Sequence, residues 1–251
     1  MNFLVLKTFL VLSGMLVITA LAGKRNHSFE TKIEFWVLFI GGIALLFIIP
    51  STVFPINLGL ALVFALLIGS MIGPGIKALM MNYVVRKSFQ KEGVTKEMLK
   101  NMSSDARIEK INAVKVAIDQ GDAHPVISDW NKLFQLAVYT TSIITIVAGT
   151  MVYALKFDFS FLEQILFVGL LGIIVVGLLN VFFFKSPLVR LIGAYVGAVI
   201  FTLYLLYDFD QLEKAAIAGD TSWETAINYA ISIYLDIVNL FLDLLEILSS
   251  D

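Results

Sequence analysis

The last hydrophobic segment, residues 226–248, constrains the fold more than any other part of the chain. It reads AINYAISIYLDIVNLFLDLLEIL, and a helix of about 20 apolar residues is enough to cross a bilayer. At about 3.6 residues per turn, four polar residues fall on one stripe of this helix: Ser232, Asp236, Asn239 and Asp243. A carboxylate at the bilayer centre costs about 2.5 kcal/mol or more, so the stripe cannot face lipid. We therefore expect other helices to surround this segment.

Composition indicates a membrane protein. Of the 251 residues, 59% are hydrophobic and 15% are charged, whereas soluble domains carry about 25% charged residues. The net charge of -2 gives no reason to expect nucleic acid as a partner. The chain has no cysteine, and His27 and His124 lie far apart in polar connections, which argues against a metal cluster. We expect no resident cofactor.

Seven stretches approach the length needed to span the hydrocarbon core. No convincing cleavage site follows the first stretch, so we expect it to be retained as a span. The sequence therefore predicts an all-α integral membrane protein whose single domain covers residues 1–251. The candidate spans are residues 3–22, 35–50, 57–81, 134–154, 161–184, 188–207 and 226–248.

A polar insert at residues 82–133 separates the third and fourth candidate spans. It carries nine lysines or arginines and seven acids, and apolar residues such as Ile108 and Ile111 recur at helical spacing within it. We expect a partly helical, extramembrane segment. One interpretation is an amphipathic hairpin that lies beside the membrane or docks a partner, and the other is a solvated loop with one short helix.

The third candidate span ends in the sequence GSMIGPG. Gly69 and Gly73 are spaced for close approach to another helix, and Pro74 removes one backbone donor. Gly73 and Pro74 are therefore candidates for a hinge, and helix packing alone is the alternative interpretation.

No known catalytic motif occurs in the chain. It lacks the GxSxG, HExxH and phosphate-binding glycine patterns. Buried aspartates suggest an intramembrane aspartyl protease, but the Gly-x-Gly-Asp motif of such proteases is missing. We expect no enzymatic activity.

Two aspartates, Asp208 at the end of the sixth span and Asp236 in the seventh, are the candidate chemistry. Consecutive spans with a short connection tend to pack side by side, but contact requires the sixth span to continue to about Leu212. Two carboxyls that meet in a water-poor site cannot readily both ionise, and they titrate as a unit. Such a pair senses protons and, when deprotonated, attracts a hard cation such as calcium. The alternative is two separate, hydrated aspartates near helix ends.

The chain resembles the Bax inhibitor-1 family, in particular its bacterial members. The resemblance is carried by the blocks IFTLYLLYDFDQL, ISIYLDIVNLFLDLLEIL, LGLALVFALLIGSMIGPGI, KFDFSFL and GLLNVFF, in the family order. It covers nearly the whole chain except the insert. The resemblance implies six spans around a central seventh, and a pH-sensing pair at Asp208 and Asp236 that gates a calcium leak.

Besides the insert, which typical members of that family lack, this sequence differs from some members at the end of the second span. Some members have an arginine near the end of the second span that contacts the aspartates, but the corresponding IIPSTVFPINLG has no basic residue. The arginine latch cannot be transferred to this chain. Four other polar residues are candidates for a pathway: Asn239, Asp243, Asp210 and Asn180.

Three functions remain open at this stage. The first is a pH-sensitive cation leak, and the second is a non-conducting regulator that binds a membrane-anchored ATP-dependent protease, with the insert as its docking surface. The third is a proton-coupled transporter. We expect the bacterial inner membrane as the location. The positive charges favour a cytoplasmic insert with the amino terminus outside, whereas the resemblance implies a cytoplasmic amino terminus.

Overall fold

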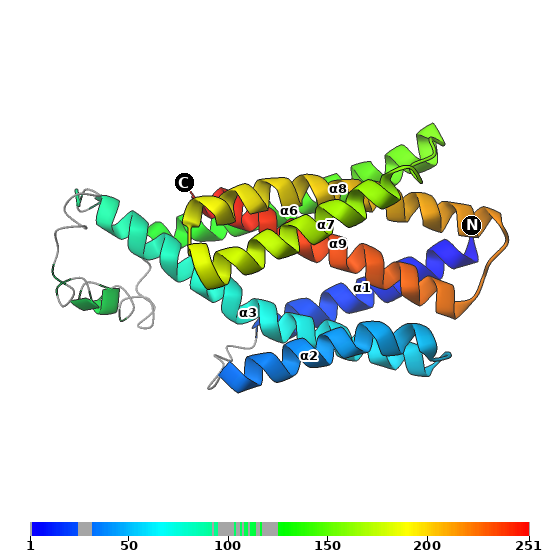
Figure 1. The fold of residues 1–251 in the computed structure, drawn as a ribbon, viewed down its shortest axis with the longest axis horizontal. Coiled ribbons are helices and arrows are strands. Elements are labelled where there is room, and N and C mark those ends of the chain that lie inside the picture. Colours follow the sequence, from blue (N-terminus) through cyan, green and yellow to red (C-terminus); the bar gives the residue numbers. More distant parts are fainter. Residues whose placement is uncertain are drawn as a thin grey trace.

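A computed structural model of the chain describes residues 2–24, 32–91, 93–94, 103, 106, 108–109, 111–113, 116 and 125–250. Within these residues every regular element is a helix, which confirms the predicted all-α fold (Figure 1). The elements are α1 (Phe3–Lys24), α2 (Lys32–Ile48), the short 3-10 helix η1 (Ile49–Ser51), α3 (Ile56–Lys91), α6 (Pro125–Leu155), α7 (Leu162–Leu179), the π-helix η2 (Asn180–Phe184), α8 (Pro187–Ile217) and α9 (Trp223–Ser250).

The helices form an elongated bundle, and the amino terminus and the end of α9 lie at its opposite ends (Figure 1). In the described part of the chain, α1, α2, α3, α6, the α7–η2 segment and α8 are long and apolar enough to cross a membrane. The chain is thus a multi-pass membrane protein. Helix α9 is not among these six helices, and it carries four acids: Glu224, Asp236, Asp243 and Glu246.

Helix α9 is the centre of the bundle. It packs against α1, α3, α6, α8 and η1, and Asn228 is the one exposed residue along its whole length. This confirms that the last segment is surrounded by protein. Helix α2 packs on α3 and η1, and α7 packs on α8, so these two form an outer layer. Because their spans are almost entirely apolar, most of their surface can face lipid.

Helix α8 is longer than the predicted sixth span. The Oγ atom of Ser186 accepts a hydrogen bond from the amide of Val189 at its start, and Pro187 fits the first turn. The helix continues to Ile217 and ends in a turn at Gly219, whose φ of 87° favours glycine. Asp208 therefore lies within α8, as contact with Asp236 requires.

Helices α3 and α6 both extend into the predicted insert. Helix α3 continues to Lys91, and α6 begins at Pro125. Their extensions, residues 82–91 and 125–133, pack around Tyr83 and Trp130, whose ring centroids are 5.8 Å apart. We call these two extensions the stalk. Residues 108–109, 111–113 and 116 are also helical, whereas the rest of the predicted insert helix, His27 and His124 lie outside the described residues.

The contact between α1 and α3 explains two glycines. A Cβ atom on Gly69 would lie 2.5 Å from the carbonyl oxygen of Thr19, and one on Gly73 would lie 2.6 Å from that of Gly23. These distances confirm close helix packing at both positions. Helix α3 continues through Pro74 as one helix, and a hinge at Gly73 and Pro74 stays a prediction.

Candidate functional site

Asp208 on α8 and Asp236 on α9 face each other in the interior of the bundle. Their side chains are 8% and 6% exposed, and the two carboxyl groups lie close enough to interact directly. Two carboxylates have no donor between them, so a hydrogen bond between these groups would require one of them to carry a proton. The Oδ2 atom of Asp236 is buried, and it has no hydrogen-bond partner among the described residues. The two residues thus form a buried pair of facing carboxyl groups.

Phenols and apolar side chains surround the pair. Tyr204 and Tyr207 of α8 and Tyr229 of α9 lie close enough to interact electrostatically with Asp208. Leu205 and Leu240 belong to the fully buried core of the same two helices. This environment has few polar groups that could replace water around a charge, so a second negative charge on the pair is strongly opposed.

Asp210, two residues after Asp208, takes part in a separate network. Its Oδ2 atom accepts hydrogen bonds from the ammonium of Lys214 at 2.6 Å and from the amide of Phe159 at 3.2 Å. Lys214 also donates to Asp158 and to the hydroxyl of Ser160. These hydrogen bonds hold the α6–α7 connection against helix α8. The hydrogen bond from Lys214 lowers the pKa of Asp158 to about 2.

Further along α9, Asp243 also faces α8. A Cβ atom on Gly197 would overlap the carboxylate of Asp243, and Oδ2 of Asp243 is buried with no hydrogen-bond partner in the described structure. Gly197 therefore provides the space that this side chain occupies. Asn239 lies between Asp236 and Asp243 on the same stripe and is half-buried.

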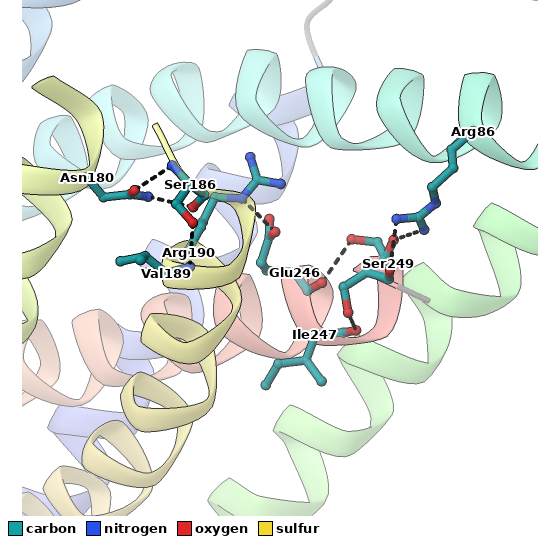
Figure 2. Close-up of polar contacts among 9 residues, drawn as sticks. Arg86, Asn180, Ser186, Val189, Arg190, Glu246, Ile247 and Ser249 are labelled. Atoms are coloured by element: carbon teal, nitrogen blue, oxygen red, sulfur yellow. Dashed lines mark hydrogen bonds and ion pairs between the residues drawn. The ribbon is translucent and has the colours of Figure 1, made fainter. Parts of the chain in front are cut away.

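Two arginines hold the end of α9 (Figure 2). The Nε atom of Arg190 on α8 donates to Glu246 at 2.7 Å. From α3, Arg86 donates to the carbonyl oxygens of Ser249 and Ser250 at 2.6 and 2.7 Å. A cation at a helix carboxyl end satisfies carbonyls that have no partner within the helix. Sequence reasoning counted Arg86 among the charges of the insert and missed this contact.

Asn180 lies far from the aspartate pair. Its side chain accepts from the amide of Ser186 at 2.8 Å and donates to the carbonyl of Ser186 at 3.2 Å (Figure 2). It closes the turn between η2 and α8. Because a helix rises about 1.5 Å per residue, Ser186 and Asp208 are separated by roughly 30 Å along α8. The structure therefore brings Asp208 and Asp236 together but leaves Asn180 at the other end of α8.

Two further contacts to α9 were not expected from the sequence. The hydroxyls of Thr19 and Tyr234 are 2.6 Å apart, which ties α1 to α9. Glu224 accepts a hydrogen bond from the amide of Phe54 at 3.0 Å. The connection between η1 and α3, which has no arginine in this sequence, therefore contacts the start of α9. A buried tyrosine and a helix-start glutamate carry no sequence pattern that would have identified their partners.

Asp208 and Asp236 together supply two carboxyl groups. Among the described residues, no group of three or more histidine, cysteine, aspartate or glutamate side chains could hold a metal ion.

Comparisons with known proteins agree with the sequence blocks. Residues 128–251 match the model of the family described as Inhibitor of apoptosis-promoting Bax1, and this match includes both aspartates. An uncharacterized protein of Campylobacter jejuni is 40% identical over 105 residues, which is 41% of this chain and 42% of that protein. Protein LIFEGUARD 4 of Arabidopsis thaliana is 34% identical over 117 residues, or 46% of this chain and 45% of that protein. The chain thus spans less than half the length of these curated relatives.

Proposed function

Because residues 128–251 place this chain in the Bax inhibitor-1 family of membrane proteins, we propose that Asp208 and Asp236 form the proton-sensing gate of a cation leak. Calcium is the proposed cation, and the bacterial inner membrane is the proposed location. The observation that carries the proposal is the burial of two facing carboxyl groups, one on α8 and one on the central helix α9.

A proton shared by the two carboxyls gives the pair two states. With the proton present, the carboxyls are hydrogen-bonded and hold α8 against α9. Its loss leaves two adjacent negative charges, which repel strongly in a site of low dielectric constant. Those charges also create a pair of oxygen ligands of the kind that calcium prefers. A proton thus controls both the α8–α9 contact and the affinity for a cation.

The proposed route away from the pair follows the polar stripe of α9. Asp243 faces α8 like Asp236, and Glu246 lies one turn further at the end of the helix. Cation movement along this route requires the contact between Arg190 and Glu246 to open. Asn239 lies between the two aspartates and supplies an additional oxygen ligand.

Calcium flux into proteoliposomes, measured over a pH series, tests the proposal. We expect flux in the wild type to change with pH, and Asp208→Asn and Asp236→Asn to abolish that pH dependence. Asp129→Asn on the stalk is the control, because its side chain is 49% exposed and far from the pair in sequence. Unchanged pH-dependent flux in both pair variants would contradict the proposal.

A second candidate is a non-conducting regulator of a membrane-anchored ATP-dependent protease. The observation that favours it is the stalk, because the Tyr83–Trp130 contact packs the end of α3 against the start of α6. The segment between α3 and α6 is therefore attached to two packed helix ends. Deleting residues 95–120 would leave α3 and α6 intact. Under this proposal the deletion abolishes capture of the protease in a pull-down. Capture that survives the deletion would count against a docking role.

A further inference from the structure

A long groove lies between α1 and α6. It has a volume of about 810 Å³ and is lined by α1, α3, α6 and α9. Helix α9 packs against both α1 and α6, and its residues Ile237, Val238 and Phe241 line the groove between them. Ser13 and Ala20 on α1 and Ser142 on α6 are exposed, so the groove opens to the outside of the bundle.

The groove is apolar although several hydroxyl groups line it. Ser13 donates its proton to the carbonyl of Phe9 at 2.7 Å, and Ser142 donates to that of Val138 at 2.8 Å. The same holds for three threonines, whose hydroxyls bond to protein atoms: Thr19, Thr141 and Thr145. With these protons already donated, the wall offers alkyl and aromatic surface, which favours an apolar occupant.

The position and length of the groove identify the kind of occupant. On α1 the lining extends from Phe9 to Lys24, which corresponds to about 22 Å at 1.5 Å per residue. This length exceeds half the thickness of the hydrocarbon core, which is about 30 Å. Because α1 and α6 are both long and apolar enough to span the membrane, the groove opens into the bilayer. Lipid chains are the surrounding solvent there.

The positively charged side chain of Lys24 lies at one end of the groove. Lys24 is the last residue of α1, its side chain is exposed, and it belongs to the groove lining. A lysine at a helix end reaches the headgroup level and attracts anionic lipid. We propose that the groove binds one acyl chain of an anionic phospholipid, with the phosphate of its headgroup against Lys24.

Lipid retention tests the proposal directly and independently of any flux. The full-length protein is taken up from vesicles of equal phosphatidylglycerol and phosphatidylcholine, extracted in mild detergent, and analysed by native mass spectrometry. We expect one retained phosphatidylglycerol. Ala20→Trp and Ser142→Trp place a large side chain in the groove and abolish retention. Leu21→Trp and Ile143→Trp, on neighbouring positions that are 64% and 60% exposed and outside the groove lining, leave it unchanged.

Lys24→Gln tests the headgroup contact without filling the groove. We expect the preference for phosphatidylglycerol over phosphatidylcholine to fall about fivefold, the effect of one lysine near a membrane surface. Equal retention in the groove and control variants would show ordinary surrounding lipid and overturn the proposal. Retention of phosphatidylcholine equal to phosphatidylglycerol in the wild type would overturn the assignment of an anionic headgroup. Because Lys24 is exposed, this variant remains informative even if a tryptophan variant fails to fold.

Discussion

At the scale of single residues, neighbouring aspartates have different surroundings. Asp208 faces a second carboxyl, whereas Asp210, two residues further along and on a different face of the same helix, binds Lys214. Asp243 lies against Gly197, and its buried Oδ2 atom has no hydrogen-bond partner among the described residues. The Asp208–Asp236 arrangement is the proposed proton sensor, and Asp210 forms a structural ion pair with Lys214. The position of Asp243 depends on the absence of a side chain at Gly197.

The contact between Gly197 and Asp243 predicts a steric effect. Gly197→Ala places a methyl group on the buried carboxylate, so we expect it to lower the free energy of unfolding by about 1–3 kcal/mol. Gly193→Ala, one turn earlier on α8, has nothing within 4 Å of its Cβ atom. It should be neutral or slightly stabilising, because alanine favours helix by up to about 1 kcal/mol. Thermal unfolding in detergent compares the two, and equal melting temperatures would contradict the contact.

The ion pair of Asp158 and Lys214 predicts an acid dependence. The pKa of Asp158 is about 2 in the folded protein, below its ordinary value of about 3.9. A carboxyl group whose pKa is lower in the folded protein stabilises the fold at pH values above its ordinary pKa. This stabilisation is lost as the pH falls through the pKa of the folded state. Asp158→Asn should therefore lower the melting temperature near neutral pH, and the difference from the wild type should shrink as the pH falls through about 2. A difference that persists in acid would exclude this origin. The effect should be small, because the Asp158 side chain is 73% exposed.

At the scale of helices, the two ends of α9 are held by different means. Its start is contacted by Phe54, whose ring stacks on Trp223 with centroids 4.9 Å apart. Its end is held by Arg86 and Arg190 from two other helices. These contacts lie outside the apolar core and restrict how far α9 can move relative to α8.

Arg86→Met should therefore loosen the end of α9. The variant removes two charge-assisted hydrogen bonds, which we expect to lower local stability by about 1–3 kcal/mol. Hydrogen exchange of the amides from 244 to 250 should become faster while exchange near Asp236 stays slow. Lys91→Met is the control, because Lys91 is the exposed last residue of α3. Unchanged exchange in Arg86→Met would show that the arginine does not hold the helix.

The α1–α3 contact gives a second prediction for helices. Gly73→Ala would bring a Cβ atom 2.6 Å from the backbone oxygen of Gly23, and a backbone atom cannot easily move away. We expect the two helices to separate locally and the melting temperature to fall. Gly75→Ala, on the other side of Pro74, has nothing within 4 Å. Equal melting temperatures for the two variants would show that close packing at Gly73 does not limit the stability of the α1–α3 contact.

At the scale of the whole molecule, one buried pair lies inside a bundle whose outer layer faces lipid. Unfolding exposes Asp208 and Asp236 to water, so the proton that we propose they share makes the global stability depend on pH. The wild type should lose stability as the pH rises and two adjacent charges form. Asp236→Asn keeps a donor to Asp208 but cannot become charged, so its melting temperature should vary less with pH. A steeper dependence in the variant would contradict the shared proton. Asp129→Asn is the control.

Much of the architecture could be predicted from the sequence because it depends on local properties. The number of apolar residues in each segment indicates membrane spans, and the free-energy cost of a carboxylate in lipid places residues 226–248 inside the bundle. The boundaries were less accurate. Helices α3, α6 and α8 continue past their apolar stretches, because polar residues with good helix propensity prolong a helix into water.

The partners of polar residues were decided by tertiary structure alone. Sequence identified Asp208 and Asp236 as a candidate pair, and Asn239, Asp243, Asp210 and Asn180 as candidates for a pathway. In the structure the pair faces each other, whereas Asp210 binds Lys214 and Asn180 binds Ser186. Lys214, Arg86 and Tyr234 carried no motif, and each connects segments that are distant in the chain. The sequence by itself determined which segments enter the membrane, since that depends on the composition of each segment. Which side chains meet depends on how all the helices pack together, and only the folded bundle establishes that.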